Sequence, residues 1–261
     1  MVLTITFIAE RASTRLAGVL LGFPLGAGLS ILFFGIEQGA SFAAESAFWG
    51  IPGVLASLSF ALLYLLGIQY LTRQKYTPII FCLLLGVAGF FVAATILYFV
   101  MPKISWLNIP LTIVGIFGFS CLFRKFHVVK IPVKVPITFL VLSVRAGFTA
   151  LVVLLVTGVA HLIGPQWSGF LSTFPVTLLP VMAILHHHYG AETIFTLLRE
   201  LPFGLLAIVV FDFSVAVSFP ILGVAGGMVV SYGVAFIYLL IYELKLRGLL
   251  AQYFFAAADR N

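Results

Sequence analysis

The chain has 261 residues, of which 62% are hydrophobic and only 8% are charged, and its mean hydropathy is +1.22. Soluble domains are only about half apolar, so this composition excludes a soluble globular domain and predicts an integral membrane protein. The formal charge of +6 does not indicate a nucleic-acid partner, because the distribution of the cations along the chain accounts for it.

Eight apolar stretches are long enough, or nearly so, to cross a bilayer core of about 30 Å, which takes about 20 helical residues. They lack the period-two alternation of membrane strands, so we expect an all-α polytopic protein and not a β-barrel. The chain divides into two membrane halves, residues 1–134 and 135–261. The expected spans are residues 16–36, 46–71, 78–100, 107–123, 135–162, 167–187, 193–217 and 218–243.

Basic residues gather before the first expected span and after the second, fourth and last spans, and Lys103 alone falls in a loop of opposite parity. Such an asymmetry is typical of loops on the cytoplasmic side of a membrane. With an even number of spans, it predicts a multi-pass protein of the cell inner membrane with both termini in the cytoplasm. The lipid bilayer is therefore the expected partner of most of the chain.

An internal repeat is visible when residues 17–39 are written above residues 168–190, and the offset of 151 continues beyond them. Span 6 is the fifth span after span 1, so the two would cross the membrane in opposite directions. We therefore expect an inverted repeat, provided that the short span 4 crosses completely. The matched residues are Gly18 and Gly169, Phe23-Pro24 and Phe174-Pro175, Gly39 and Gly190, and Gly53 and Gly204.

Each copy of the repeat has a Phe-Pro step about eight residues into its span, roughly 12 Å deep. Proline removes a backbone donor and clashes with the preceding turn, so it leaves carbonyls free near the middle of the membrane. Paired broken helices point to a transporter binding site, although Gly and Pro also serve close helix packing. The residues expected to line such a site are Phe23, Pro24, Ser172, Thr173, Phe174, Pro175 and Thr177.

The pattern of Ser168-Gly169-Phe170, Phe174-Pro175, Gly190, Arg199 and Phe203-Gly204 resembles that of the GlpM-like small bacterial inner-membrane proteins. The first half of the chain matches this pattern less completely, because Phe48 occupies the position that corresponds to Arg199 in the repeat. The resemblance covers about half of the chain. It implies a polytopic inner-membrane protein with a link to exopolysaccharide production, and it brings no catalytic residues with it.

Ionisable side chains inside spans are functional candidates, because each costs at least about 2.5 kcal/mol at the membrane centre on insertion scales. Arg145 is either one half of an ion pair with Glu200 or Asp212, or a cation that binds an anionic solute. Arg199 is the second expected solute-binding cation. Glu200, Asp212 and His188 are the candidates for proton coupling.

Three consecutive histidines end span 6. On a regular helix their side chains spread over about 200°, so they cannot all bind one metal ion. We expect them to form a polar cap at the cytoplasmic end of the span. A transition-metal site is kept as an alternative, with His186, His187, His188 and Glu192 as its ligands.

The sequence contains no nucleotide-binding loop, nucleophile motif or zinc-protease motif, so we predict neither enzymatic activity nor a cofactor. The leading hypothesis is a secondary transporter that binds a small polar or anionic solute between spans 1 and 6. One alternative is a non-enzymatic membrane partner in envelope polysaccharide or lipid handling, and another is a transition-metal transporter. The sequence leaves open a homo-oligomer or a complex with a membrane partner protein.

Overall fold

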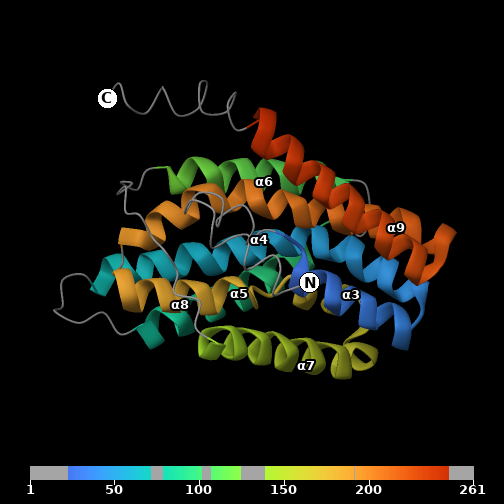
Figure 1. Cartoon of the computed structure of the whole chain (residues 1–261), viewed down its shortest axis with the longest axis horizontal. Helices are drawn as coiled ribbons and strands as arrows, with labels where there is room; N and C mark the ends of the chain where they lie inside the picture. Colours follow the sequence, from blue (N-terminus) through green and yellow to red (C-terminus); the bar gives the residue numbers. More distant parts are fainter. Residues whose placement is uncertain (1–22, 72–78, 102–106, 125–138, 191, 247–261) are drawn as a thin grey trace.

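The computed structural model describes residues 23–71, 79–101, 107–124, 139–190 and 192–246. These residues form helices joined by short connections and include no strand. Four of the helices are long and apolar enough to cross a membrane. The prediction of an all-α membrane fold is therefore confirmed at this level, and Figure 1 shows the long helices lying side by side.

The helices follow the continuous apolar runs of the sequence, because a chain in lipid must pair its backbone polar groups within each segment. Residues 102–106 and 125–138, between some of these helices, lie outside the described part of the chain. The helices are α3 (Leu25–Glu37), α4 (Ala40–Leu71), α5 (Ile79–Val100), α6 (Asn108–Phe123), α7 (Phe139–Ser172), α8 (Leu178–Tyr189) and α9 (Glu192–Ile241), and α9 ends in a π-helical turn, Tyr242–Leu246.

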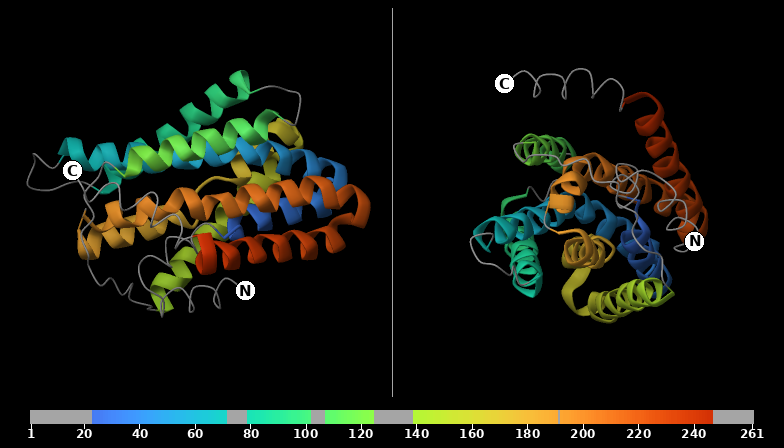
Figure 2. Two further views of the ribbon diagram at one scale, coloured as in Figure 1. Left: turned by 90° about the horizontal axis from the view of Figure 1, so that it is seen from above. Right: turned by 60° about the vertical axis from the view of Figure 1, so that its left-hand side comes forward.

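Two long helices change direction at glycines. In α7 the bend is at Gly164, whose φ is 76°, and in α9 it is at Gly223, whose φ is 68°. Residues other than glycine rarely adopt these backbone angles. In Figure 2 the part of α9 that follows Gly223 runs back along the part that precedes it. The expected boundary between spans 7 and 8, at residues 217–218, was therefore wrong, because the helix continues through Pro220 until a residue with positive φ allows the turn.

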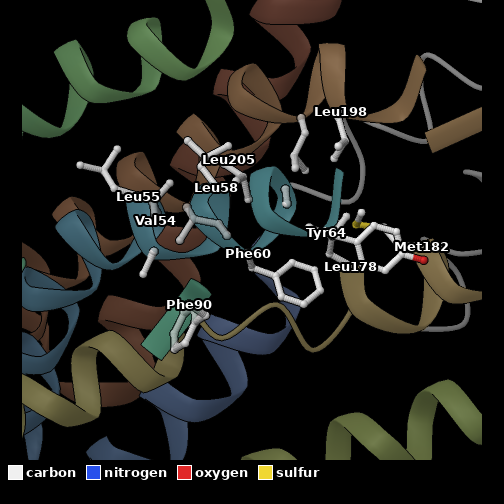
Figure 3. Close-up of a cluster of buried hydrophobic side chains, with 14 of the residues drawn as sticks. Val54, Leu55, Leu58, Phe60, Tyr64, Phe90, Leu178, Met182, Leu198 and Leu205 are labelled. Atoms are coloured by element: carbon white, nitrogen blue, oxygen red, sulfur yellow. The ribbon is translucent and has the colours of Figure 1, made fainter. Parts of the chain in front are cut away.

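Helix α4 lies at the centre of the molecule (Figure 2). Of its most apolar 18-residue stretch, 78% is buried, compared with 28% for α5 and for α7. Lipid tails are as apolar as these side chains, so the core is held by close packing and not by exclusion of water. Figure 3 shows the core, in which Val54, Leu58, Phe60 and Tyr64 of α4 meet Phe90 of α5, Leu178 and Met182 of α8, and Leu198 and Leu205 of α9.

The outward faces of the peripheral helices carry large exposed apolar side chains. They include Leu84 and Phe99 of α5, Val114 of α6, Leu154 of α7 and Ile237 of α9. Soluble monomers rarely expose apolar surface this extensively. Contact with lipid accounts for it.

Candidate solute-binding site

The helix expected over residues 167–187 is interrupted at its Phe-Pro step. Helix α7 ends at Ser172, α8 begins at Leu178, and residues 173–177 between them are not helical. The interruption leaves backbone groups without helical partners. One of them is the carbonyl of Thr173, which accepts a hydrogen bond of 2.5 Å from Ser57 Oγ on α4. The break is therefore tied directly to the central helix.

The other Phe-Pro step stands at the start of α3. Phe23 is buried, and its ring stacks on that of Tyr232 with 5.8 Å between the ring centroids. The Tyr232 hydroxyl donates a hydrogen bond of 3.4 Å to the carbonyl of Pro24. The rest of expected span 1, residues 16–22, lies outside the described part of the chain.

The two Phe-Pro steps line one small cavity of about 30 Å³. This volume holds only a few water molecules, so a larger solute can enter only if the helices move apart. Ser57 of α4 and Leu205 and Ile208 of α9 also line the cavity, and the sequence did not single them out. The expected residues that line it are Phe23, Pro24, Ser172, Thr173, Phe174, Pro175 and Thr177.

Helices α3 and α8 both begin at this cavity and run away from it toward opposite ends of the molecule (Figure 1). Neither Pro24 nor Thr177, the residue that precedes each helix, caps its first turn with a side-chain hydrogen bond. Helix N-termini carry unpaired N–H groups and a partial positive charge. Two such ends at one cavity favour an anionic or polar group between them.

Of the two cations expected at the site, only Arg199 has a described side chain. Arg199 is half-buried on α9, six residues before Leu205, and does not line the cavity. The side chain of Arg145, on α7, lies outside the described part of the structure, and so do its expected pairings with Glu200 and Asp212. Glu200 is buried and accepts a hydrogen bond of 3.3 Å from the hydroxyl of Tyr242.

Asp212 is fully buried on α9, and neither of its carboxyl oxygens has a hydrogen-bond partner among the described residues. The carboxyl group lies against Gly50 of α4, where a Cβ atom would stand 2.5 Å from Asp212 Oδ2 and 3.5 Å from Ser172 Oγ. A side chain at position 50 would therefore force this carboxyl group to shift. The two buried carboxyl groups of α9 thus differ, because Glu200 has a hydrogen-bond partner and Asp212 has none among the described residues.

The three histidines do not converge. His186 is buried, and its Nδ1 lies 2.9 Å from the hydroxyl of Tyr64 on α4, whereas His187 and His188 are exposed near the end of α8. The helix ends at Tyr189 because Gly190, with φ of 81°, turns the chain before Glu192. Within the described residues, no group of three His, Cys, Asp or Glu side chains is placed to hold a metal ion. Nothing in the sequence distinguishes His186 from its neighbours.

Removal of the Tyr64 hydroxyl is expected to destabilise the protein. The Tyr64→Phe variant leaves the buried His186 ring nitrogen without its partner, which costs about 1–3 kcal/mol. Thermal unfolding in detergent should therefore begin several degrees lower than in the wild type. The His188→Ala variant is the matched control, because that side chain is exposed. Equal stability of Tyr64→Phe and wild type would show that the contact does not hold α8 to α4.

Helix α6 has a buried polar face that sequence reasoning missed. The side chains of Asn108, Thr112 and Ser120 are buried there, and none has a hydrogen-bond partner among the described residues. Their spacing of four and eight residues places them on one side of the helix, a signal that was available in the sequence. Gly115 of the same helix packs closely on Leu55 of α4.

No protein-family model, curated protein or solved structure matches this chain. The geometry of the cavity and of the groups around it is therefore the basis for a functional proposal.

Proposed function

We propose that the chain is a secondary transporter of the cell inner membrane that binds a small polar or anionic solute between the two Phe-Pro steps. The observation that supports this most strongly is that the two steps, 151 residues apart in the sequence, line the same cavity. Paired breaks of this kind, near the middle of the membrane and at corresponding positions of two halves, are typical of transporter binding sites.

An inverted repeat around the cavity is the architecture that we infer. Gly39 and Gly190, which follow α3 and α8, both have positive φ, of 92° and 81°. Helix α4 and the part of α9 before Gly223 follow these glycines in the same way. The cavity is lined by residues that the offset of 151 pairs, namely Phe23 with Phe174, Pro24 with Pro175, Gly26 with Thr177, Ala27 with Leu178, and Ser57 with Ile208.

The two halves would move against each other to expose the cavity to one side of the membrane and then to the other. Gly26 supports a tight closed state, since a Cβ atom there would overlap the side chain of Val176 in the other half. The hydroxyls of Ser57 and Thr177 and the starts of α3 and α8 would replace the water around the solute. A cavity of about 30 Å³ then corresponds to a closed state of the transport cycle.

Loss of the Thr177 hydroxyl is expected to reduce transport without changing the fold. The Thr177→Val variant keeps the side-chain shape but removes a hydrogen bond to the solute, and a hydrogen bond to a charged group contributes about 1.5–3 kcal/mol, or at least about tenfold in affinity. The measurement is swelling of proteoliposomes in isosmotic ammonium chloride, nitrate, phosphate and sulfate, and in the matching potassium salts with valinomycin. The control is Thr95→Val, because Thr95 is exposed on α5 and bonds its own helix.

The assay also separates the proposal from its alternatives. If well-folded wild-type protein carries none of these anions or a panel of small neutral solutes, and instead purifies with a stoichiometric partner protein, the chain is a membrane partner in envelope polysaccharide or lipid handling. Equal flux through Thr177→Val and wild type would show that the cavity is not the binding site. Metal transport through the histidines has less support, because His186 contacts Tyr64 and does not join His187 and His188.

A further inference from the structure

The structure assigns Asp212 as the proton-binding group of this chain, and its protonation as the condition for anion binding in the neighbouring cavity. The second part of this assignment, the link to anion binding, rests on the proposed function. The first part, that the Asp212 carboxyl group binds and releases a proton, stands on the burial and surroundings of this side chain.

Asp212 has no exposed surface, and neither carboxyl oxygen has a hydrogen-bond partner among the described residues. A carboxylate that is buried without a partner is among the most unfavourable groups in a membrane protein, and such groups commonly mark proton pathways. Ser46 Oγ, one turn before Gly50 on α4, is also buried without a described partner. Asp212 and Ser46 are therefore two buried polar side chains near Gly50 that packing alone does not explain.

The carboxyl group lies close to the cavity without lining it. Leu205, Ile208 and Asp212 are spaced by three and four residues, so they lie along one face of α9, and the first two line the cavity. Ser172 also lines the cavity, and its hydroxyl lies beside Gly50 together with the Asp212 carboxyl group. A change of charge on Asp212 would therefore act on a solute about one helical turn away.

The surroundings favour a proton over a metal cation as the ligand. Hard cations need several oxygen ligands, but the side-chain oxygens that lie beside Gly50 are only those of Asp212 and Ser172 among the described residues. On the helices packed against α9 in this region, Glu37 of α3, Glu45 of α4 and His161 of α7 are exposed. Of the described side chains, none with a charge faces the carboxyl group.

The other candidates for proton binding fit less well. Glu200 accepts a hydrogen bond from Tyr242 and does not line the cavity. His188 is exposed near the far end of α8, more than two turns from the start of that helix at the cavity. Asp212 is the candidate that combines burial, lack of a described partner and closeness to the cavity.

The coupling follows from electrostatics. An ionised Asp212 would repel an anion in the cavity, because charges interact strongly where water and salt are excluded. When a carboxyl oxygen takes up a proton, an O–H bond forms and the charge disappears, so an anion can bind between the ends of α3 and α8. On the other side of the membrane the O–H bond breaks, the proton leaves to water, and the restored charge expels the anion. Proton and anion would thus cross together.

Infrared spectroscopy tests the proton site without any transport. Difference spectra of the purified full-length protein between acidic and alkaline pH should contain a carbonyl band of a buried carboxylic acid that disappears as the pH rises. The Asp212→Asn variant should lack this band, and the control Glu45→Gln, which alters an exposed carboxylate, should keep it. Absence of the band from the wild type, or its removal by sodium at constant pH, would overturn the assignment.

Flux measurements test the coupling. Wild-type proteoliposomes should swell in ammonium phosphate, nitrate or chloride without an ionophore, because ammonia enters by itself and the protein supplies the accompanying proton. For the transported anion, Asp212→Asn should lose this swelling but still swell in the potassium salt with valinomycin, as expected of uncoupled anion flux. Swelling of Asp212→Asn in the ammonium salt at the wild-type rate would overturn the coupling role. If the wild type carries no anion but the infrared band is present, the transport proposal fails and the proton site stands.

Discussion

Substitution of Gly169 by alanine is expected to cause the largest loss of stability in this fold. A Cβ atom at position 169 of α7 would overlap the carbonyl oxygen of Ser46 and would stand 2.7 Å from Trp49 Cβ and 2.9 Å from the backbone nitrogen of Gly50. These atoms belong to the backbone or next to it, so they cannot move without shifting α4. Overpacking of this kind costs about 3 kcal/mol, which is roughly 6–12 °C in melting temperature.

A matched control for this variant lies on the same helix. Gly158 of α7 is exposed, and a Cβ atom there would meet no neighbour within 4 Å, so Gly158→Ala should be as stable as the wild type or slightly more stable, because alanine is the better helix former. Melting in detergent measures both variants. Equal melting temperatures for Gly169→Ala and Gly158→Ala would show that α4 and α7 are not in this close contact.

Replacement of Pro175 by alanine is expected to abolish transport while the protein remains folded. Alanine provides the missing N–H and removes the clash with the preceding turn, which relieves a penalty of about 3 kcal/mol against a continuous helix. Residues 173–177 can then join α7 to α8 in one helix. That change would move Phe174 and Thr177 out of the cavity and remove the start of α8 from it. Swelling of the proteoliposomes should fall to the level of protein-free liposomes.

The control for this variant is Pro220→Ala. Pro220 is exposed on α9, and the helix already continues through it, so its replacement should leave transport unchanged. Circular dichroism of Pro175→Ala should show a helix content at least equal to that of the wild type. Wild-type transport by the Pro175→Ala protein would mean that the break has no part in solute binding.

Gly169 and Pro175 lie in neighbouring parts of one structural unit. Close contact between α4 and the end of α7 is possible because Gly50, Gly53 and Gly169 have no side chains, and at Gly53 a Cβ atom would stand 2.5 Å from Thr173 Oγ1. This contact holds the residues just before the break against the central helix. The break itself can then change shape next to a rigid support, which is what a binding site between moving halves requires.

The sequence by itself was sufficient to predict the class of protein and most of the helix bounds. Continuous apolar runs determine helices in lipid, because backbone groups there have no other partners. The expected spans 78–100 and 107–123 thus agree with α5 (Ile79–Val100) and α6 (Asn108–Phe123) to within one residue. The Phe-Pro step in span 6 also predicted the break correctly, since proline acts on the backbone of its own helix.

Only the tertiary structure decided which residues meet. It brought Phe23-Pro24 to the break at Pro175, left Arg199 away from the cavity, turned His186 toward Tyr64 and placed Asp212 against Gly50. In a soluble helix an alternation of apolar and polar residues reveals the inward face. Here the lipid is as apolar as the protein core, so the inward and outward faces of each helix have nearly the same composition, and the neighbours of a side chain follow only from the packed structure.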